Sequence, residues 1–258
     1  MNIVTTIKEW QALRKNLVNH TIGFVPTMGH LHAGHLSLCK RSQQENTLTI
    51  VSIFVNPTQF NQSSDFTNYP RTIKQDSDML TAHHIDYLFL PNAEEMYADH
   101  YQMQVMETTL STELEGKYRP GHFHGVLTVI LKLLNLVQPQ RIYFGEKDYQ
   151  QLLLIKKMVS ALFLPVEVIA CKTIRANDGL ALSSRNSRLT SEQRKKAVDF
   201  ARLLQSSLDT ETIHVELQKL GFKVDYIADK WQRRLGAVWL DEVRLIDNRL
   251  LAQEHNHA

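Results

Sequence analysis

The sequence predicts an α/β protein: a doubly wound parallel sheet followed by a smaller α+β domain. Short apolar runs alternate with helical patterns as far as about residue 171, which is the order that produces a parallel sheet. One run, LTIVSIFV at 48–55, has the β-branched and aromatic content of a strand buried on both faces. Beyond about residue 175 the pattern changes to helices and short strand-like pieces. We therefore expect residues 1–175 to form a Rossmann-like domain and residues 176–258 a smaller C-terminal domain.

The individual elements follow from helix caps, apolar periodicity and turn residues. Thr6 and Glu9 form a capping-box pattern, which predicts a first helix as far as about Val18. The tail after Leu251 is expected to fray. The larger domain is then predicted to contain a strand at 21–25, a helix at 34–45, a strand at 48–55, a helix at 72–82, a strand at 86–90, a helix at 126–137, a strand at 141–144, a helix at 149–163 and a strand at 166–171. In the smaller domain we predict helices at 190–206 and 211–220 and strands at 224–228 and 243–246.

Composition excludes several classes of protein. The chain has 258 residues, 43% of them hydrophobic, so it can bury a sizeable core. Its formal net charge is +2 and its basic residues are scattered, which argues against a nucleic-acid partner. No apolar run approaches the roughly 20 residues of a membrane helix, and the N-terminus lacks the apolar core of a signal peptide. Cys39 and Cys171 are too far apart in sequence to suggest a disulfide framework, so we expect a reducing, cytoplasmic location.

The stretch PTMGHLHAGH, at 26–35, follows a predicted strand and leads into a predicted helix. Gly29 and Gly34 would let a phosphate approach bare backbone, and the helix start would aim its N–H groups and positive dipole end at that phosphate. His32 and His35, three residues apart, can then flank one anion. The stretch therefore predicts a phosphate-binding turn.

Other interpretations of these histidines stay open, since such side chains are often simply packed or exposed. Zinc is the sharper alternative, because His30, His32 and His35 lie within six residues of one another. We expect the side chains of His30 and His32 to diverge from a helical His35, and no H-E-x-x-H or paired-cysteine pattern occurs. A zinc site is therefore disfavoured.

Three further loops carry polar groups. Gln59, in VNPTQF, comes just after a buried strand, where open α/β sheets place their ligands. In FGEKDYQQL, Lys147 can meet a phosphate and Gln151 can face the same cleft. Ser183 begins the run Ser-Ser-Arg after an Asp-Gly turn, and such a run can wrap phosphates. Taken singly, Gln59 is more often a loop residue than a ligand, Lys147 and Asp148 fit a solvated turn with a helix cap as well as a site, and the Ser-Ser-Arg run means little.

The combination of motifs carries a resemblance. The H-x-G-H core resembles the nucleotide motif of the nucleotidyltransferase superfamily. Across nearly the whole chain, the sequence resembles the pantothenate synthetase (pantoate–β-alanine ligase) family through seven ordered segments: PTMGHLHAGH, VSIFVNPTQF, YPRT, RPGHFHGV, FGEKDYQQL, DGLALSSRN and RLIDN. The segment DKWQRRLGAVWLDEV, at 229–243, departs from the family pattern, which puts only lid or interface detail in doubt.

The resemblance implies a reaction and roles for individual residues. Pantoate and ATP would give pantoyl adenylate and pyrophosphate, and β-alanine would then attack the acyl carbon to give pantothenate and AMP. His35 would act as a proton donor, with His32 and Lys147 also catalytic. Gln59 and Gln151 would hold pantoate. The ATP site would be formed by Met28, Gly29, His30, Leu31, His32, Ala33, Gly34, His35, Gly145, Glu146, Lys147, Asp148, Ile174, Leu182, Ser183, Ser184 and Arg185.

The remaining implications concern partners. Arg119 and His122 are candidate partners for the substrate carboxylates. Mg²⁺ would accompany ATP, with Asp76 as a candidate ligand but no dedicated metal cage in the sequence. The resemblance also implies a homodimer, and we expect the smaller domain to act as a lid that protects the adenylate from water.

Two rival functions share part of this pattern. A cytidylyl- or adenylyltransferase would share the H-x-G-H turn but would need a basic pocket for a phosphorylated acceptor, whereas Gln59 and Gln151 are neutral. A non-catalytic nucleotide- or metal-binding module would leave the other loops unexplained. The two glutamines favour a carboxylic acid substrate.

Overall fold

The computed structural model describes residues 1–61 and 63–251. The chain divides into two compact units, Met1–Lys172 and Thr173–Ala258. The predicted domain boundary, after residue 175, differs from this division by a few residues. The expectation of a frayed tail concerns residues 252–258, which lie outside the described part of the chain.

The N-terminal unit is built on a six-stranded sheet in the order β1-β4-β3-β2-β5-β6, and every neighbouring pair is parallel. This confirms the predicted doubly wound parallel sheet. The first strand was not predicted, because three residues are too few to show a pattern. The strands are β1 Asn2–Val4, β2 Ile22–Thr27, β3 Leu48–Ile53, β4 Tyr87–Phe89, β5 Arg141–Gly145 and β6 Glu167–Cys171.

Helices and 3₁₀ turns connect these strands. Thr6 caps the first helix by accepting a hydrogen bond from the backbone N–H of Glu9 at 3.2 Å, as predicted, but the α-helix ends at Arg14 and continues as a 3₁₀ turn. The α-helices are α1 Ile7–Arg14, α2 Ala33–Glu45, α3 Ser63–Thr67, α4 Ile73–Ala82, α5 Ala93–Met96, α6 Leu114–Tyr118, α7 His122–Val137 and α8 Tyr149–Ala161. The 3₁₀ turns are η1 Lys15–Leu17, η2 Pro57–Gln59, η3 Leu110–Thr112 and η4 Glu146–Asp148.

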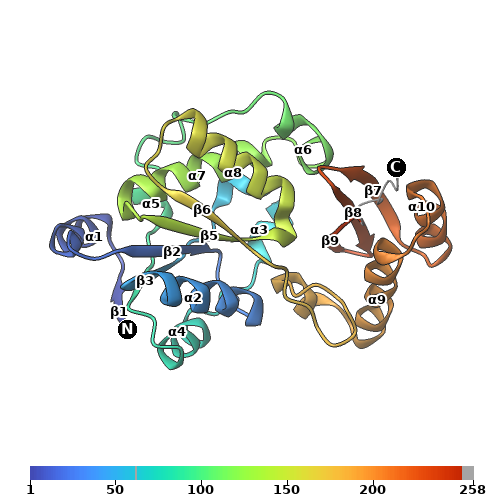
Figure 1. Cartoon of the computed structure of the whole chain (residues 1–258), viewed down its shortest axis with the longest axis horizontal. Helices are drawn as coiled ribbons and strands as arrows, with labels where there is room; N and C mark the ends of the chain where they lie inside the picture. The colour runs from blue at the N-terminus through green and yellow to red at the C-terminus, as the bar shows by residue number, and fades with distance from the viewer. Residues whose placement is uncertain (62, 252–258) are drawn as a thin grey trace, which may run out of the picture. The chain divides into compact units, whose positions relative to one another are not determined.

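Helices cover both faces of the sheet, with α7 and α8 on one side and α2 and α4 on the other (Figure 1). Successive strand residues point to opposite faces, so Phe24 packs with the core under α7 and α8. Its neighbour Val25 packs with the core under α2 and α4. Burial on both faces explains why the central strands are almost continuously apolar.

The sheet changes direction between β2 and β5. From β2 the chain adds β3 and β4 on one side, and it then returns to place β5 on the other side. Such a switch point leaves a crevice at the carboxyl ends of the two strands, which is where open α/β sheets bind ligands. The predicted phosphate turn follows β2, and the loop with Lys147 follows β5.

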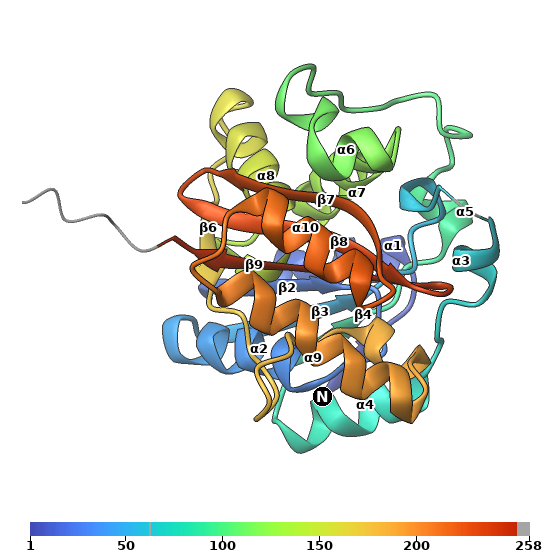
Figure 2. The ribbon, with the colours of Figure 1, turned by 90° about the vertical axis from the view of Figure 1, so that its right-hand side faces the viewer.

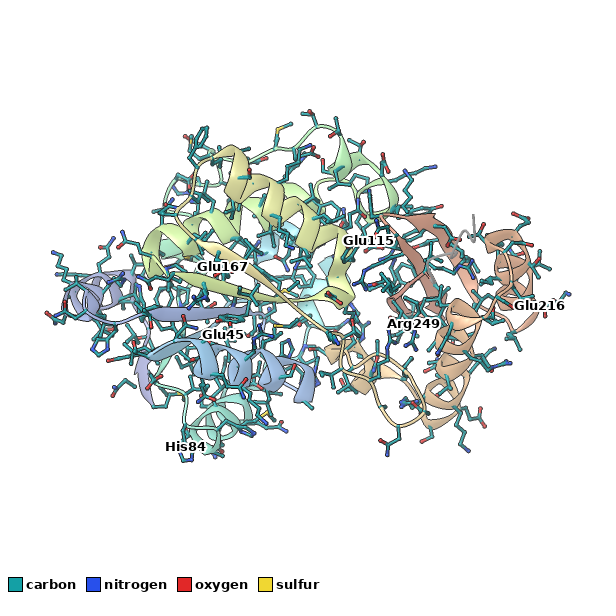
Figure 3. The ribbon with its side chains drawn as sticks, viewed as in Figure 1. Glu45, His84, Glu115, Glu167, Glu216 and Arg249 are labelled. Carbon is teal, nitrogen blue, oxygen red and sulfur yellow. The ribbon has the colours of Figure 1, made fainter. Side chains whose placement is uncertain are left out.

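The end of α2 is attached to β5 by polar contacts. Glu45, labelled in Figure 3, is the last residue of α2 and accepts a hydrogen bond from the Tyr143 hydroxyl at 2.8 Å. Burial and then the hydrogen bond to Glu45 raise the pKa of Tyr143, so its hydroxyl stays protonated. This contact holds one end of the helix whose other end carries His35.

The C-terminal unit has an antiparallel sheet, β7-β8-β9, and two long helices that lie over one face of it (Figure 2). This confirms the predicted α+β character. Its elements are η5 Ser184–Arg188, α9 Ser191–Gln205, α10 Thr210–Lys219, β7 Lys223–Lys230, β8 Arg233–Leu240 and β9 Val243–Leu250. Within the described residues of the whole chain, no helix has the length and apolar character needed to cross a bilayer.

The middle strand, β8, was missing from the sequence prediction. The turn before it consists of Trp231 and Gln232, both with left-handed φ values of 54° and 59°. A two-residue turn of this kind normally uses Asn or Gly, so the usual hairpin signal is absent. The segment 229–243, which departs from the family pattern, is therefore largely a strand and its two turns.

Candidate active site

The turn after β2 has two successive residues with left-handed backbone. Gly29 has φ of 81° and His30 has φ of 52°. Backbone N–H groups in such a turn converge to form a small anion-binding concavity. Here the N–H groups of His30 and Leu31 donate to the two carboxylate oxygens of Asp76, at 2.9 and 2.8 Å. The concavity is filled by the protein's own carboxylate, so these two donors are not available to a phosphate.

Asp76 does not fit the role of a magnesium ligand. It lies in the first turn of α4 and is only 1% exposed. Besides the two backbone donors, the Thr72 hydroxyl donates to it at 3.1 Å. Its oxygens are thus engaged and shielded, whereas Mg²⁺ usually keeps several waters and binds through accessible carboxylates and phosphates. The described residues contain no group of three or more His, Cys, Asp or Glu arranged for a metal.

The two histidines of H-x-G-H cap the start of α2. The His32 side chain accepts from the Gly34 N–H at 3.1 Å through Nδ1, and the Nδ1 of His35 accepts from the His32 N–H at 3.3 Å. The ring centroids are 4.1 Å apart. The prediction that His32 would diverge from His35 is therefore wrong: as the residue that caps the helix, His32 turns back over its first turn.

This capping assigns the tautomer of both rings. A neutral imidazole has one N–H, and Nδ1 acts as an acceptor in both rings, so the proton resides on Nε2. Backbone groups expected to meet a phosphate are used by the caps instead. The Nε2–H groups of His32 and His35 are then two donors that the turn can offer to an anion.

Both histidines are neutral at pH 7. Burial, followed by the charges of His32 and Lys147, lowers the pKa of His35 from 6.5 to about 3. Burial, followed by the charges of Lys147 and His30, lowers the pKa of His32 to about 4. Each ring can therefore offer a neutral donor to an anion, while the positive charge nearby comes from Lys147.

These pKa values predict that stability falls in acid. Between about pH 6.5 and pH 4 the unfolded chain binds protons on these rings that the native chain does not, so the free energy of unfolding rises with pH. For His35 alone, the loss between pH 7 and about pH 4.5 should be roughly 3 kcal/mol. Urea unfolding of the native protein and of His35→Gln, across this range, measures the difference.

The exposed His20 gives a matched control. His20→Gln should keep the wild-type pH profile, whereas His35→Gln should flatten it. Equal profiles for the native protein and His35→Gln would show that the ring is not held neutral.

Lys147 follows β5, the strand next to β2. It lies in η4, directly after β5, with its side chain 17% exposed and Nζ 3.9 Å from a carboxylate oxygen of Asp148. Its charge lowers the pKa of both His32 and His35, and β5 is the neighbour of β2, the strand that leads to the two rings. The structure therefore brings together the three predicted catalytic side chains at the switch point between β2 and β5.

Gln59 lies at the end of η2, after β3, and its amide contacts the same turn. Its Nε2 is 2.7 Å from the sulfur of Met28, and its Oε1 accepts from the amide of Asn56 at 3.2 Å. Asn56 is 1% exposed and also donates to the Gly125 carbonyl at 3.1 Å. The Tyr97 hydroxyl donates to Asn56 at 2.7 Å, so the amide that orients Gln59 is itself fixed.

Arg119 and His122 bind the backbone of Gln59. Both donate to its backbone carbonyl, Arg119 at 3.2 Å and His122 through Nδ1 at 2.8 Å. The guanidinium of Arg119 is also 3.0 Å from Nε2 of His122. These contacts give the two residues a part in placing Gln59, and their predicted contact with substrate carboxylates stays a prediction.

The first turn of α8 carries two glutamines with different surroundings. Gln150 is 3% exposed and its amide is engaged by the backbone of Leu110, Glu113 and Glu115. Gln151 is partly exposed and, one residue further on, lies on another side of the helix. Gln150 therefore has a structural role, and Gln151 remains the candidate for binding the substrate.

Five of the predicted ATP residues lie in the C-terminal unit: Ile174, Leu182, Ser183, Ser184 and Arg185. The Leu182 N–H donates to the Ile174 carbonyl at 3.0 Å, across a turn in which Gly179 has φ of 88°. Ser183 caps η5 by accepting from the Arg185 N–H at 3.2 Å. The unit thus gathers Ile174 and residues 182–185 into one short segment, and their contact with ATP stays a prediction.

Sequence reasoning missed Asn56 and Tyr97 and misjudged Asp76. An Asn before Pro is a typical cap of a short turn, and Asn56 caps η2 in this way. Tyr97 lies 41 residues from Asn56, so no local pattern could pair them. Asp76, the candidate magnesium ligand, instead binds the backbone of His30, which lies 46 residues away, and no local pattern could show that contact.

Comparison with known proteins gives consistent matches over almost the full chain. A family model described as pantoate-beta-alanine ligase matches residues 2–250. A pantothenate synthetase of Legionella pneumophila (strain Lens) is 50% identical over 252 residues, covering 97% of this chain and 100% of the relative. The pantothenate synthetase of Coxiella burnetii (strain RSA 493 / Nine Mile phase I) is 48% identical, and the match covers 98% of both chains.

Solved structures give the same family. Pantoate-beta-alanine ligase from Francisella tularensis, complexed with beta-gamma ATP and beta-alanine, has a TM-score of 0.94 with 42% identity, and the match covers 97% of both chains. Pantothenate synthetase from Thermus thermophilus has a TM-score of 0.88 with 41% identity, covering 96% of this chain and 99% of that one.

Proposed function

The chain belongs to the pantoate–β-alanine ligase family, and from this we propose that it condenses pantoate with β-alanine at the expense of ATP. The reaction proceeds through pantoyl adenylate and releases pyrophosphate and AMP. The observation that carries the proposal is the convergence of two neutral histidines and Lys147 at the sheet's switch point. That is the arrangement an attack on an α-phosphate requires.

In the first half-reaction, a carboxylate oxygen of pantoate attacks the α-phosphorus of ATP. A new P–O bond forms while the bond to the β-phosphate breaks, and pyrophosphate leaves with the electron pair. Negative charge grows on the α-phosphate and on the leaving group. The Nε2–H groups of His32 and His35 and the ammonium of Lys147 supply fixed donors for that charge, so no protein nucleophile is needed.

In the second half-reaction, the amine of β-alanine attacks the acyl carbon of the adenylate. The amide bond forms, the bond between the acyl carbon and the bridging oxygen breaks, and the amine releases a proton. AMP leaves with that bridging oxygen, which came from pantoate. The adenylate is a mixed anhydride, so the site must keep water away from it between the two steps.

The acid substrate is recognised by neutral groups on this proposal. Gln59 is oriented by Asn56 and lies beside Met28, which places an uncharged amide next to the histidine turn. Amide groups can bind the hydroxyls and the carboxylate of pantoate without adding charge. A transferase that joins a nucleotide to a phosphate ester would instead need cations at this position.

The proposal also includes the state of the substrate and of the protein. Mg²⁺ would enter with ATP and would neutralise charge on its phosphates, and Asp76, which is 1% exposed, would not hold it. The large apolar side chains of Tyr101, Met103 and Met106 are exposed within six residues of the chain, which supports the homodimer that the family resemblance implies. The free, buried thiols of Cys39 and Cys171 support a reducing, cytoplasmic location.

Product analysis tests this function. Purified protein with MgATP, pantoate and β-alanine should yield AMP, pyrophosphate and pantothenate in equal amounts. ADP and inorganic phosphate as products would overturn the adenylate route. Transfer of a nucleotide to a phosphate ester, without amide formation, would favour the rival transferase.

A further inference from the structure

Asp76 fills the concavity next to the histidines, and we propose that it is a positioning residue for adenylate formation. Its carboxylate holds the backbone of the turn that directly precedes His32 and the first turn of α2, where His35 lies. On this proposal Asp76 does not bind magnesium. This inference rests on the proposed function for its kinetic test. The structural basis, however, is independent of which substrate the site takes.

Three donors from two segments converge on this carboxylate. The backbone N–H groups of His30 and Leu31 come from the turn, and the Thr72 hydroxyl comes from the residue before α4. The fit is close, since a Cβ added at Gly29 would lie 3.1 Å from Asp76 Oδ2 and 3.0 Å from Ile53. The turn after β2, the end of β3 at Ile53 and the first turn of α4 at Asp76 are therefore packed closely together around Gly29.

The fixed backbone leads directly to the catalytic rings. Leu31 is followed by His32, whose side chain caps α2 and meets His35. His30 has a left-handed backbone, which is uncommon for a residue with a side chain and persists where surrounding contacts hold it. Removing the two acceptors from the His30 and Leu31 amides leaves buried donors unpaired, so the turn should rearrange and carry His32 with it.

This arrangement requires a carboxylate at position 76, because each of its two oxygens accepts a hydrogen bond from a backbone N–H group. An Asn in its place offers only one acceptor oxygen, and its NH₂ group would face a backbone N–H donor. Asp76→Asn therefore keeps the size of the side chain but disrupts the arrangement. Asp78→Asn is the matched control, since Asp78 lies on the same helix but is exposed and pairs with exposed Lys74.

The test compares these variants in pyrophosphate release from MgATP and pantoate. We expect Asp76→Asn to lower kcat about 10- to 100-fold, with KM for pantoate and the Mg²⁺ concentration for half-maximal rate unchanged. Asp78→Asn should match the native protein. A shifted Mg²⁺ requirement with activity restored at high Mg²⁺ would identify Asp76 as a metal ligand and overturn the inference, as would a normal kcat.

A second measurement does not depend on activity. Long-range ¹H–¹⁵N NMR spectra should show Nε2–H tautomers for His32 and His35 in the native protein and altered ring signals in Asp76→Asn. If the native protein releases no pyrophosphate but these signals still change, the proposed function fails while the positioning role stands. Unchanged signals in the variant would overturn the positioning role.

A milder variant covers the case in which Asp76→Asn does not fold. Thr72→Val removes one of the three donors and retains both backbone contacts. We expect a smaller loss of kcat with the same unchanged Mg²⁺ dependence. A loss of Mg²⁺ affinity in Thr72→Val would contradict the inference, because threonine only supports the carboxylate.

Discussion

Replacing His35 with alanine will lower the rate of pantoyl adenylate formation by about 10²–10³-fold and leave the protein folded. The ring is neutral at pH 7, since burial lowers its pKa to about 3, and its Nδ1 is occupied by the His32 N–H. Its Nε2–H is therefore a fixed donor for the charge that develops on the α-phosphate. Single-turnover measurements with MgATP and pantoate give the rate of this step directly.

Two conservative variants separate the donor from the cap. Asn at position 35 can place its oxygen near the position of Nδ1, so it can keep the bond from His32 but cannot reach the phosphate. Gln can place its NH₂ group near the position of Nε2 and so restores a donor. We expect His35→Asn to be as slow as His35→Ala, and His35→Gln to recover part of the rate. The reverse order would mean that His35 acts through the helix cap.

Much of the fold could be predicted because it depends on local pattern. The run at 48–55 is apolar because β3 is covered on both faces, and Thr6 marks the start of α1 because its side chain caps that helix. The strand β8 could not be predicted in the same way. Its preceding turn uses Trp231 and Gln232 where a hairpin normally shows Asn or Gly.

In the candidate site, too, local motifs could be predicted from the sequence and contacts between distant residues could not. H-x-G-H leads to the candidate site at the switch point, yet the donors differ from the expectation, because the histidine side chains cap the helix and Asp76 occupies the turn. That carboxylate lies 46 residues beyond His30 in the chain. Contacts of this range depend on how α4 packs, and a single sequence holds no local signal for them.

The second large effect concerns the intermediate. An acyl-adenylate route makes pyrophosphate without the amine, whereas a route that needs the amine for the first bond change makes none. Protein mixed with MgATP and pantoate alone should release about one equivalent of pyrophosphate per site and then stall, because the bound anhydride is kept from water. Adding β-alanine should discharge AMP and pantothenate without further ATP.

Labelled oxygen makes this measurement the most direct test of the adenylate mechanism. With ¹⁸O in the carboxylate of pantoate, rapid quenching after β-alanine is added should find one labelled oxygen in AMP, since the bridging oxygen leaves with the nucleotide. His35→Ala, run in parallel, should show a slower burst of the same size. Unlabelled AMP, or no pyrophosphate before the amine is added, would contradict the mechanism assigned to His32, His35 and Lys147.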